Sequence, residues 1–355
     1  MFHLFNRWEK IMLTMRHVMG ALAGLGAVAL SCLSPAAAQN PKLVVRVDWH
    51  PWGMHAGLHL AKDKGWFDQA GVDVTVTDGK GSSLVMTQIA TGEVDVGWVQ
   101  QGAMVIARYK GYPLKSVALL VRTGDLGMMV PATAGYKTLK DLEGKKVGVA
   151  QANGAFPFLD KWLKLSGTSR DKMTLVQVDA TSLVSVYSSG EVEGSLSAVP
   201  FFIPIVENVR PATGITLASV GINVPSYGLT VTEKTLAEKE DALRRFVPVV
   251  ARAWEYIYGL EAAYTRDTSS SPRLDEAVDA MVRQRPGEKI DARVIRAQIE
   301  HYRPYFWTER TKDAKFGWAE DEDWKQAMDD LKEAMLVPAS AKVEDIYTNK
   351  FVKRN

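Results

Sequence analysis

The stretch RVDWHPWGMHAG gathers aromatic and imidazole rings in a segment that reads as the connection between a strand and a helix. Asp48, Trp49, Trp52 and His55 supply a carboxylate, two indoles and an imidazole. An indole stacks on flat rings, and an offset stacked pair contributes about 0.5 to 1.5 kcal/mol beyond the burial of its area. Pro51 stiffens the loop, which lowers the cost of ordering it when a solute binds. The stretch therefore predicts a preformed surface on which Trp49 stacks and Asp48 and His55 bond ring nitrogens or amines.

The ends of the other expected strands add polar and aromatic side chains. In open α/β sheets, loops at the carboxyl ends of strands and the helix N-termini facing them form the ligand crevice. The sequence places there Gly81, Ser82, Ser83, Trp98, Gln100 and Gln101 in its first half, and Asn153, Gly154, Phe156, Asp179, Thr181, Phe201 and Phe202 in its second half. We expect one site that is rich in rings and amides and poor in charge, which suits a small planar solute.

The loop GKGSS leaves a second class of solute open. Its two glycines and two hydroxyls precede a helix, whose first backbone amides could receive an anion or a carboxylate. The loop lacks the Lys-Ser/Thr ending of a phosphate loop. A sulfonate, nitrate or an aromatic carboxylate is therefore the alternative to a planar heteroaromatic solute.

Metal and catalytic signals are weak in this sequence. His55, His59 and Asp63 are spaced by four residues along an expected helix and could present two nitrogens and an oxygen to zinc. Lys62 and Lys64 adjoin them, and no fourth ligand is evident. No Ser/His/Asp arrangement can be assembled from the histidines. We therefore predict a binding protein with no metal, no cofactor and no catalytic residue.

Short β-rich runs alternate with helical patterns along most of the chain, which indicates largely parallel, helix-covered sheets of the α/β class. Expected strands cover 42–49, 72–79, 94–99, 145–150, 173–178 and 193–199, with helices between them. A long amphipathic helix is expected from Leu243 to Tyr264, after a capped turn over 232–238.

An internal repeat predicts two lobes. IATGEVDVGW and VYSSGEVEGSLS each join a helix end, a glycine cap and a strand. We expect residues 39–130 to form the first part of lobe I, 131–225 to form lobe II, and 226–355 to return to lobe I as C-terminal helices. The two crossings, expected near 128–132 and 224–228, would make a hinge.

Residues 1–38 read as a secretory signal peptide, because an apolar run follows three basic residues and ends in Ser-Pro-Ala-Ala-Ala. Cys32, the only cysteine, lies in this segment and supports the less favoured alternative of a lipoprotein. Removal of the segment takes the formal charge from +2 to 0, because three basic and one acidic residue leave with it. We expect a monomeric periplasmic protein without disulfides, with neither nucleic acid nor an anionic membrane as partner.

Several segments carry a family resemblance. The stretches VDWHPWGMHAGLHLAKDKGWFDQAGVDV, GKGSSLVMTQIATGEVDVGW, LKDLEGKKVGV and SGEVEGSLS, and the ending VEDIYTNKFV, are similar to solute-binding proteins of ABC importers in the nitrate, sulfonate, taurine and thiamine-pyrimidine group. The resemblance implies a two-lobed periplasmic binding protein of type II that closes on a small solute. It also implies an ABC permease in the inner membrane as partner.

Within that group, Asp48-Trp49, Pro51 and His55 resemble a stretch of the pyrimidine-precursor binders and their fungal synthase relatives. The resemblance implies that Trp49 stacks on the pyrimidine and that His55 lies at the ligand. Trp52 departs from the pattern, which often has Asn there. The fungal relatives are enzymes that consume a histidine at the place of His55 and need iron and a cysteine-rich segment. We expect this chain to bind rather than to react.

Overall fold

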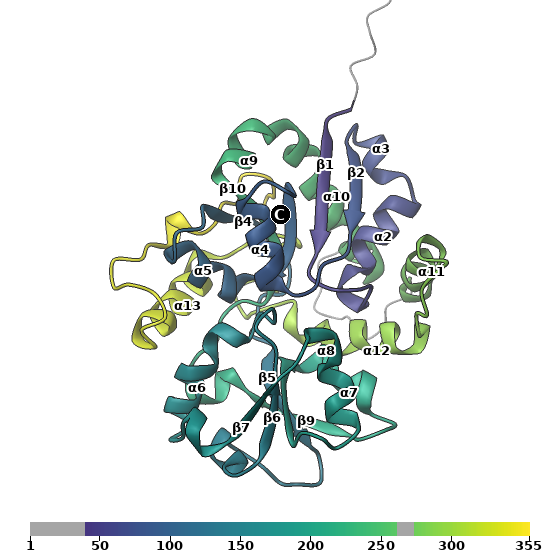
Figure 1. Cartoon of the computed structure of the whole chain (residues 1–355). Helices are drawn as coiled ribbons and strands as arrows, with labels where there is room; N and C mark the ends of the chain where they lie inside the picture. Colours follow the sequence, from purple (N-terminus) through teal and green to yellow (C-terminus); the bar gives the residue numbers. More distant parts are fainter. Residues whose placement is uncertain (1–39, 261–272) are drawn as a thin grey trace, which may run out of the picture. The chain divides into compact units, whose positions relative to one another are not determined.

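The structure is a computed structural model that describes residues 40–260 and 273–355 (Figure 1). The predicted signal peptide, the Cys32 alternative and the last residues of the helix expected to reach Tyr264 lie outside the described residues. Among the described residues, no helix combines the length and the apolar character that a membrane crossing requires.

Two five-stranded sheets organise residues 41–355, and we call each sheet with its helices a lobe. The first sheet has the order β2-β1-β3-β10-β4, with β1 (Lys42–Val47), β2 (Asp73–Thr77), β3 (Val96–Gln100), β4 (Leu114–Leu119) and β10 (Tyr227–Thr232). The second has the order β7-β6-β8-β5-β9, with β5 (Leu126–Pro131), β6 (Lys146–Val149), β7 (Thr174–Gln177), β8 (Gly194–Ala198) and β9 (Ala212–Thr216).

The two sheets share one topology. β1 pairs in parallel with β2 and β3, as β6 does with β7 and β8. The repeated sequence ends in β3 and β8, which hold the same place in their sheets. Gly92 and Gly190, the repeat's glycines, both have φ of 79°. This left-handed conformation suits glycine and ends the preceding helix in each lobe.

Both sheets are mixed rather than largely parallel as predicted. β10 runs antiparallel to β3 and β4, and β5 runs antiparallel to β8 and β9. β5 already belongs to the second sheet, so the first crossing lies before Leu126 and not near 128–132. β5 and β10 are buried along their whole length, and such runs carry no alternation that would reveal strand direction.

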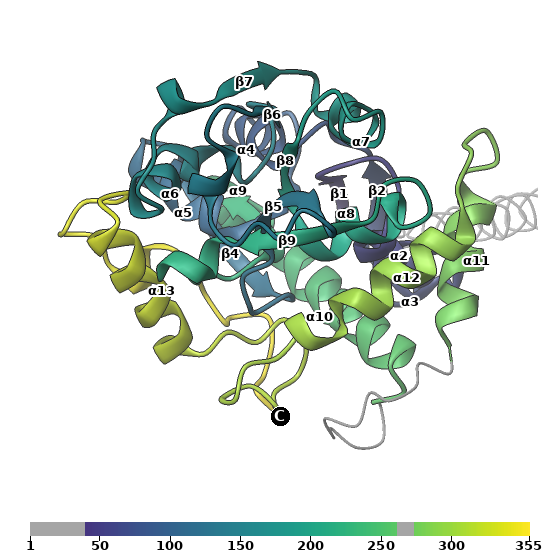
Figure 2. The same cartoon turned by 90° about the horizontal axis from the view of Figure 1, so that it is seen from below.

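Helices cover the faces of both sheets (Figures 1 and 2). The first lobe has α2 (Ala56–Asp63), α3 (Trp66–Gln69), α4 (Ser82–Ala90) and α5 (Gln101–Tyr109), and the second has α6 (Leu159–Leu165), α7 (Leu183–Ser188) and α8 (Val199–Val206). The C-terminal part has α9 (Glu233–Glu238), α10 (Glu240–Ile257), α11 (Leu274–Gln284), α12 (Ala292–Tyr302) and α13 (Asp321–Glu333). Short 3-10 turns are η1 (Gly53–His55), η2 (Leu139–Leu142), η3 (Phe156–Phe158), η4 (Arg170–Lys172), η5 (Ala180–Ser182), η6 (Leu217–Val220), η7 (Arg303–Tyr305) and η8 (Val343–Asp345).

The C-terminal helices were expected to return to the first lobe. α10 and α11 pack on α2, but α12 contacts both η1 of the first lobe and α8 of the second. Gln298 of α12 makes this double contact specific, because its Oε1 accepts the Gly53 amide at 2.9 Å and its Nε2 donates to the Phe201 carbonyl at 3.0 Å. α12 therefore holds one loop from each lobe against the other.

Candidate functional site

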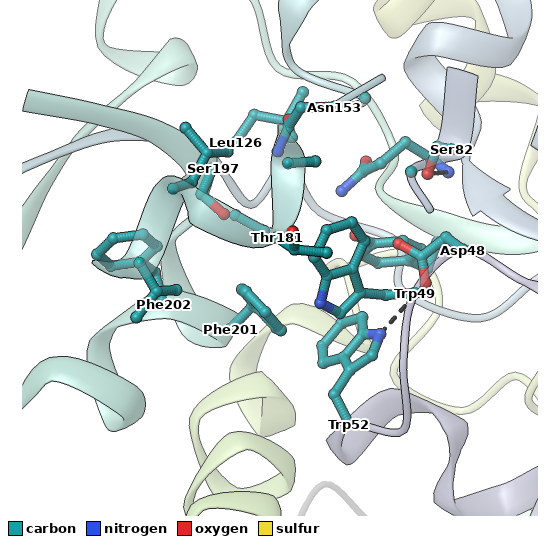
Figure 3. Close-up of a pocket in the computed structure, with 18 of the residues that line it drawn as sticks. Asp48, Trp49, Trp52, Ser82, Leu126, Asn153, Thr181, Ser197, Phe201 and Phe202 are labelled. Carbon is teal, nitrogen blue, oxygen red and sulfur yellow. Dashed lines mark hydrogen bonds between the residues drawn. The ribbon is translucent and has the colours of Figure 1, made fainter. Parts of the chain in front are cut away.

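A cavity lies between the two lobes, at the carboxyl ends of β1 and β3 (Figure 3). Its volume is about 210 Å³. Its lining comprises Asp48, Trp49, Trp52, Gly81, Ser82, Gln100 and Tyr227 from the first lobe, and Leu126, Asn153, Gly154, Ala180, Thr181, Leu183, Val184, Ser197, Ala198, Phe201, Phe202 and Ile205 from the second.

Asp48 is the best-held polar group of the cavity. It follows β1 directly and is only 6% exposed. Its Oδ1 accepts a hydrogen bond from Trp52 Nε1 at 3.2 Å and lies 2.9 Å from His55 Nε2, which must be the donor because a carboxylate only accepts. Since both donors meet the same oxygen, the carboxylate keeps acceptor capacity on Oδ2.

The formal charge of the cavity lining is negative. Among the described residues that line the cavity, Asp48 alone carries a formal charge at neutral pH, and none is Lys, Arg or His. Burial, followed by the charges of Asp48 and Asp125, raises the pKa of Tyr227 well above its ordinary value, so this phenol stays neutral. The site therefore favours solutes that bring hydrogen-bond donors or positive charge.

Trp49 and Trp52 play different parts in the wall. Trp49 is half-buried and packs against Ala180 and Leu183 of the second lobe, so it spans the gap between the lobes. Trp52 is 2% exposed and meets Phe201 edge-on, with ring centroids 5.1 Å apart. Trp52 is thus held in place by its neighbours, whereas the half-buried ring of Trp49 is more accessible to a solute.

Gln100 reaches the cavity from the end of β3 with its amide oriented by a buried carboxylate. Its Nε2 donates to Asp125 Oδ1 at 3.0 Å, and the Tyr302 hydroxyl donates to Asp125 Oδ2 at 2.6 Å. Burial raises the pKa of Asp125, and these two donors act in the opposite direction. Because the nitrogen of Gln100 faces Asp125, its Oε1 is left as a buried acceptor with no hydrogen-bond partner in the described structure.

The lobes touch along a rim beside the cavity. Gly81 has φ of 117°, and a Cβ there would lie 2.2 Å from the Ala152 carbonyl oxygen, so only glycine fits. The Ser83 amide donates to the same carbonyl at 3.2 Å. A Cβ on Gly154 would lie 2.7 Å from Gln100 Cγ. The rim is therefore in a closed arrangement in this structure.

Many of the predicted site residues line the cavity, namely Asp48, Trp49, Trp52, Gly81, Ser82, Gln100, Asn153 and Phe201. Gly154, Thr181 and Phe202, expected beside them, line it as well. The predicted residues outside the lining are His55, Ser83, Trp98, Gln101, Phe156 and Asp179.

Three of the predicted residues outside the lining are buried behind residues that line the cavity. His55 is fully buried and reaches the site only through Asp48. Trp98 is fully buried and stacks on Tyr227, which takes the place at the cavity that we expected for Trp98. Gln101 turns back to the sheet, where its Nε2 donates to the Val99 carbonyl and to Thr230. Only the residue at the very end of β3 reaches the cavity.

The other three exceptions have local roles. Ser83 bonds the rim through its backbone amide. Phe156 packs under the Arg170 guanidinium, 5.5 Å from its ring centroid. Asp179 caps η5, accepting from both the amide and the hydroxyl of Thr181, and these hydrogen bonds lower its pKa. Each sits one or two residues from a lining residue, which sequence reading alone does not resolve.

Sequence reasoning missed an apolar part of the lining, one serine and one tyrosine. These residues are Leu126, Ala180, Leu183, Val184, Ser197, Ala198, Ile205 and Tyr227. Most belong to runs that read as ordinary core, because apolar periodicity is the same for a face that meets a cavity and a face that meets a sheet. Tyr227 starts an antiparallel strand that the sequence did not reveal.

The three residues that were considered as zinc ligands each contact a different partner. His55 contacts Asp48, His59 Nδ1 contacts Gln284 Oε1 at 3.0 Å, and Asp63 pairs with Arg283 at 2.7 Å. Burial lowers the pKa of His59 to about 4, which keeps it neutral. These contacts describe a packed helix face.

Comparison with known families decides the classification. A family model described as NMT1/THI5 like matches residues 52–260, more than half of the chain. The chain belongs to the NMT1/THI5-like family. The resemblance found in the sequence is thereby confirmed at the level of the family.

Relatives of this NMT1/THI5-like chain bear names of two kinds. The riboflavin-binding protein RibY of Chloroflexus aurantiacus is 24% identical over 310 residues, which cover 84% of this chain and 82% of the relative. A 4-amino-5-hydroxymethyl-2-methylpyrimidine phosphate synthase of Aspergillus parasiticus is 23% identical over 235 residues, which cover 62% of this chain and 68% of the relative. Relatives of the chain thus include a protein named as a binder and a protein named as a synthase.

Solved structures share the fold of this family member. The alkanesulfonate-binding protein SsuA of Xanthomonas axonopodis pv. citri superposes with a TM-score of 0.63 at 16% identity, covering 88% of this chain and 99% of that one. The periplasmic nitrate-binding protein NrtA of Synechocystis PCC 6803 gives 0.61 at 12% identity, covering 87% and 86%. These matches confirm the predicted α/β periplasmic binding protein fold.

Proposed function

We propose that this NMT1/THI5-like protein is an exported solute-binding component of an ABC importer that captures a small planar heteroaromatic solute bearing N–H donors. The observation that carries the proposal is the lining itself. Its only formal charge is the Asp48 carboxylate, which stands beside the Trp49 indole. An amino-substituted ring nitrogen heterocycle matches this set with donors at its edge and a flat face for stacking.

Binding would use both lobes. Asp48, Gln100 and Tyr227 meet the edge of the ring from the first lobe, and Trp49 meets its face. Thr181 and Phe201 approach from the second lobe, so the full set of contacts exists only when the lobes are closed. The solute then shifts the open–closed equilibrium by its preference for the closed form. Micromolar affinity needs about 8 kcal/mol, which stacking and several satisfied hydrogen bonds can supply.

The relatives support a periplasmic binding role. RibY is named for binding riboflavin, which is a planar nitrogen heterocycle, and the similar solved structures are named as binding proteins. The family's synthases raise the alternative of an enzyme that consumes its own histidine. Here His55 is fully buried behind Asp48, and its Nε2 is already engaged. We place His55 as a positioning residue that holds Asp48.

An anionic solute is the second class that the sequence left open. Sulfonate and nitrate carry negative charge into a cavity whose only charged side chain is a carboxylate. Like charges in a partly buried site repel strongly because water screens them poorly. The lining therefore supports the heteroaromatic proposal over the anionic one.

The test is a titration of the purified protein that follows tryptophan fluorescence and heat of binding. Probes are 4-amino-5-hydroxymethyl-2-methylpyrimidine, thiamine and riboflavin on one side, and an alkanesulfonate and nitrate on the other. We expect strong quenching and micromolar or tighter binding by at least one heterocycle. Binding of the anions alone would reject the proposal.

Replacement of Trp49 and Asp48 tests the assigned roles. We expect Trp49→Ala and Asp48→Asn each to weaken heterocycle binding at least tenfold, because one removes the stacking face and the other the acceptor charge. The melting temperature of the solute-free Trp49→Ala protein should change little. Asp171→Asn is the matched control, since this exposed carboxylate of the second lobe lies outside the lining. Equal losses in the control and in Asp48→Asn would contradict the roles.

The synthase alternative has its own measurement. Purified protein is incubated with iron(II) and air, and the peptide that contains His55 is weighed by mass spectrometry. We expect its mass to stay unchanged and no pyrimidine to form. Loss of mass at His55 together with a pyrimidine product would identify an enzyme instead.

A further inference from the structure

We infer that the solute carries an apolar substituent on the side opposite its donor edge, held by the second lobe. This inference rests on the proposed function and narrows its substrate class. It starts from the unequal chemistry of the two halves of the cavity.

The polar recognition groups lie mainly on the first lobe. Asp48, Ser82, Gln100 and Tyr227 all come from that lobe and present oxygen or nitrogen atoms at one side of the cavity. Figure 3 shows Asp48 and Ser82 together on one side, with Leu126, Ser197 and Phe202 on the other.

The far side of the cavity is an apolar wall interrupted by Ser197. It is built by Leu126 of β5, Leu183 and Val184 of α7, Ala198 of β8, and Phe202 and Ile205 of α8. None of the second-lobe residues that line the cavity carries a charge at neutral pH. A surface of this kind gains free energy only when an apolar group displaces water from it.

Polar side chains on the second lobe are already partly used within the chain. The Thr181 hydroxyl donates to Asp179 Oδ1 at 2.6 Å. Asn153 Oδ1 accepts the amide of Ala155 at 2.9 Å. The Asn153 Nδ2 donor and the Ser197 hydroxyl remain as polar groups of the second lobe that could meet the solute, among a larger number of apolar side chains.

The cavity reaches from the first lobe to the apolar side chains of the second. Its lining includes Asp48 and Trp49 on one lobe and Val184 and Ile205 on the other. A ring held at Asp48 and Trp49 would leave space in front of Val184 and Ile205. An alkyl or aryl group on the ring would occupy that space.

The experiment compares matched probes by calorimetry on the full-length exported protein. The parent is 4-aminopyrimidine, and the extended probes are 4-amino-5-phenylpyrimidine and 4-amino-6-phenylpyrimidine. We expect at least one phenyl compound to bind tenfold or more tightly than the parent. A gain below twofold for both phenyl compounds would overturn the inference while leaving the proposed function intact if the parent binds. No binding by any of the three would overturn the inference, and it would reject the proposed function as well if the hydroxymethylpyrimidine, thiamine and riboflavin also fail to bind.

Variants of the apolar wall test whether the phenyl group gains its affinity there. Val184→Asn and Ile205→Asn each place an amide on the apolar wall, and we expect each to reduce the affinity ratio between the phenyl compound and the parent at least fivefold. Val209→Asn is the matched control, because Val209 is 69% exposed and lies outside the lining. Circular dichroism and melting curves check that each variant is folded. A ratio that stays unchanged in both wall variants would place the substituent elsewhere and contradict the inference.

Discussion

At the scale of single residues, the site depends on how a few buried polar groups are held. Asp48 shares one oxygen with Trp52 and His55, and Asp125 fixes the amide of Gln100. His55 and Asp125 lie outside the lining, and they determine which atoms of Asp48 and Gln100 face the cavity. The roles of Asp48 and Trp49 are therefore best judged together with the residues that orient them.

His59 gives a pH-dependent prediction at this scale. Burial lowers its pKa from 6.5 to about 4 in the folded protein. The unfolded chain therefore binds the proton more readily, so acidification from pH 6.5 to 4 favours unfolding, by up to about 3 kcal/mol from this one group. Below pH 4 both states are protonated, and the contribution of His59 is fully lost.

The variant His59→Asn tests this assignment. The Asn amide can replace the Nδ1 donor that meets Gln284, but it does not titrate. We expect the free energy of unfolding of the variant, measured in urea, to fall less steeply than that of the wild type between pH 6.5 and 4. Parallel pH profiles for the two proteins would show that His59 does not contribute.

At the scale of elements, the starts of helices and turns form the rim. Gly81 and Ser83 at the start of α4 meet Ala152 after β6, and Gly154 meets the side chain of Gln100. These close approaches depend on glycine, which leaves room for backbone or side chains of the other lobe. In the loop GKGSS, Gly81 serves this contact between the lobes, whereas Gly79 lies against its own lobe, where a Cβ would be 2.3 Å from the Val47 carbonyl oxygen.

The variant Gly154→Ala tests the role of the rim in closing the lobes. Its φ is not in the left-handed region, so the added methyl causes no backbone strain, but it would lie 2.7 Å from Gln100 Cγ. We expect solute affinity to fall at least fivefold, because the lobes cannot close fully, with little change in the melting temperature of the solute-free protein. Gly287→Ala is the control, since a Cβ there meets nothing within 4 Å. Titration calorimetry that finds equal affinities for the two variants would contradict the rim's role.

At the scale of the whole described chain, two topologically equivalent lobes are joined by strands and by α12. β10 lies between β3 and β4, and β5 lies between β8 and β9, so the strands that carry the chain between the lobes are paired on both sides within their sheets. Gln298 adds a third tie between η1 and α8. Motion between the lobes should therefore open the rim and leave the side held by α12 in place.

Small-angle X-ray scattering tests that motion. We expect a saturating heterocyclic solute to lower the radius of gyration, because the rim contacts seen here form in the closed state. The Gly154→Ala protein should show a smaller decrease. The same solute at one hundred times its Kd should stabilise the wild type by about 2.7 kcal/mol in a melting experiment. A radius that does not change on binding would refute closure.

The sequence by itself determined the local features. Alternating strand and helix periods predicted the α/β class, and the glycine caps at Gly92 and Gly190 marked equivalent places in two lobes. The ring-rich loop after the first strand identified Asp48, Trp49 and Trp52, which the structure places in the cavity lining. These features follow from short-range preferences of neighbouring residues, which is why a single chain reveals them.

Tertiary structure decided strand direction and which faces meet the cavity. β5 and β10 are fully buried runs, so nothing local showed that they run antiparallel to their neighbours. Val184 and Ile205 lie in expected helices whose sequence did not mark them for the cavity that they line. Trp98 was predicted at the site, but Tyr227 stacks on it and lines the cavity instead. An apolar side chain has the same sequence pattern in a core and in a binding wall, because the difference lies in what the rest of the chain places against it.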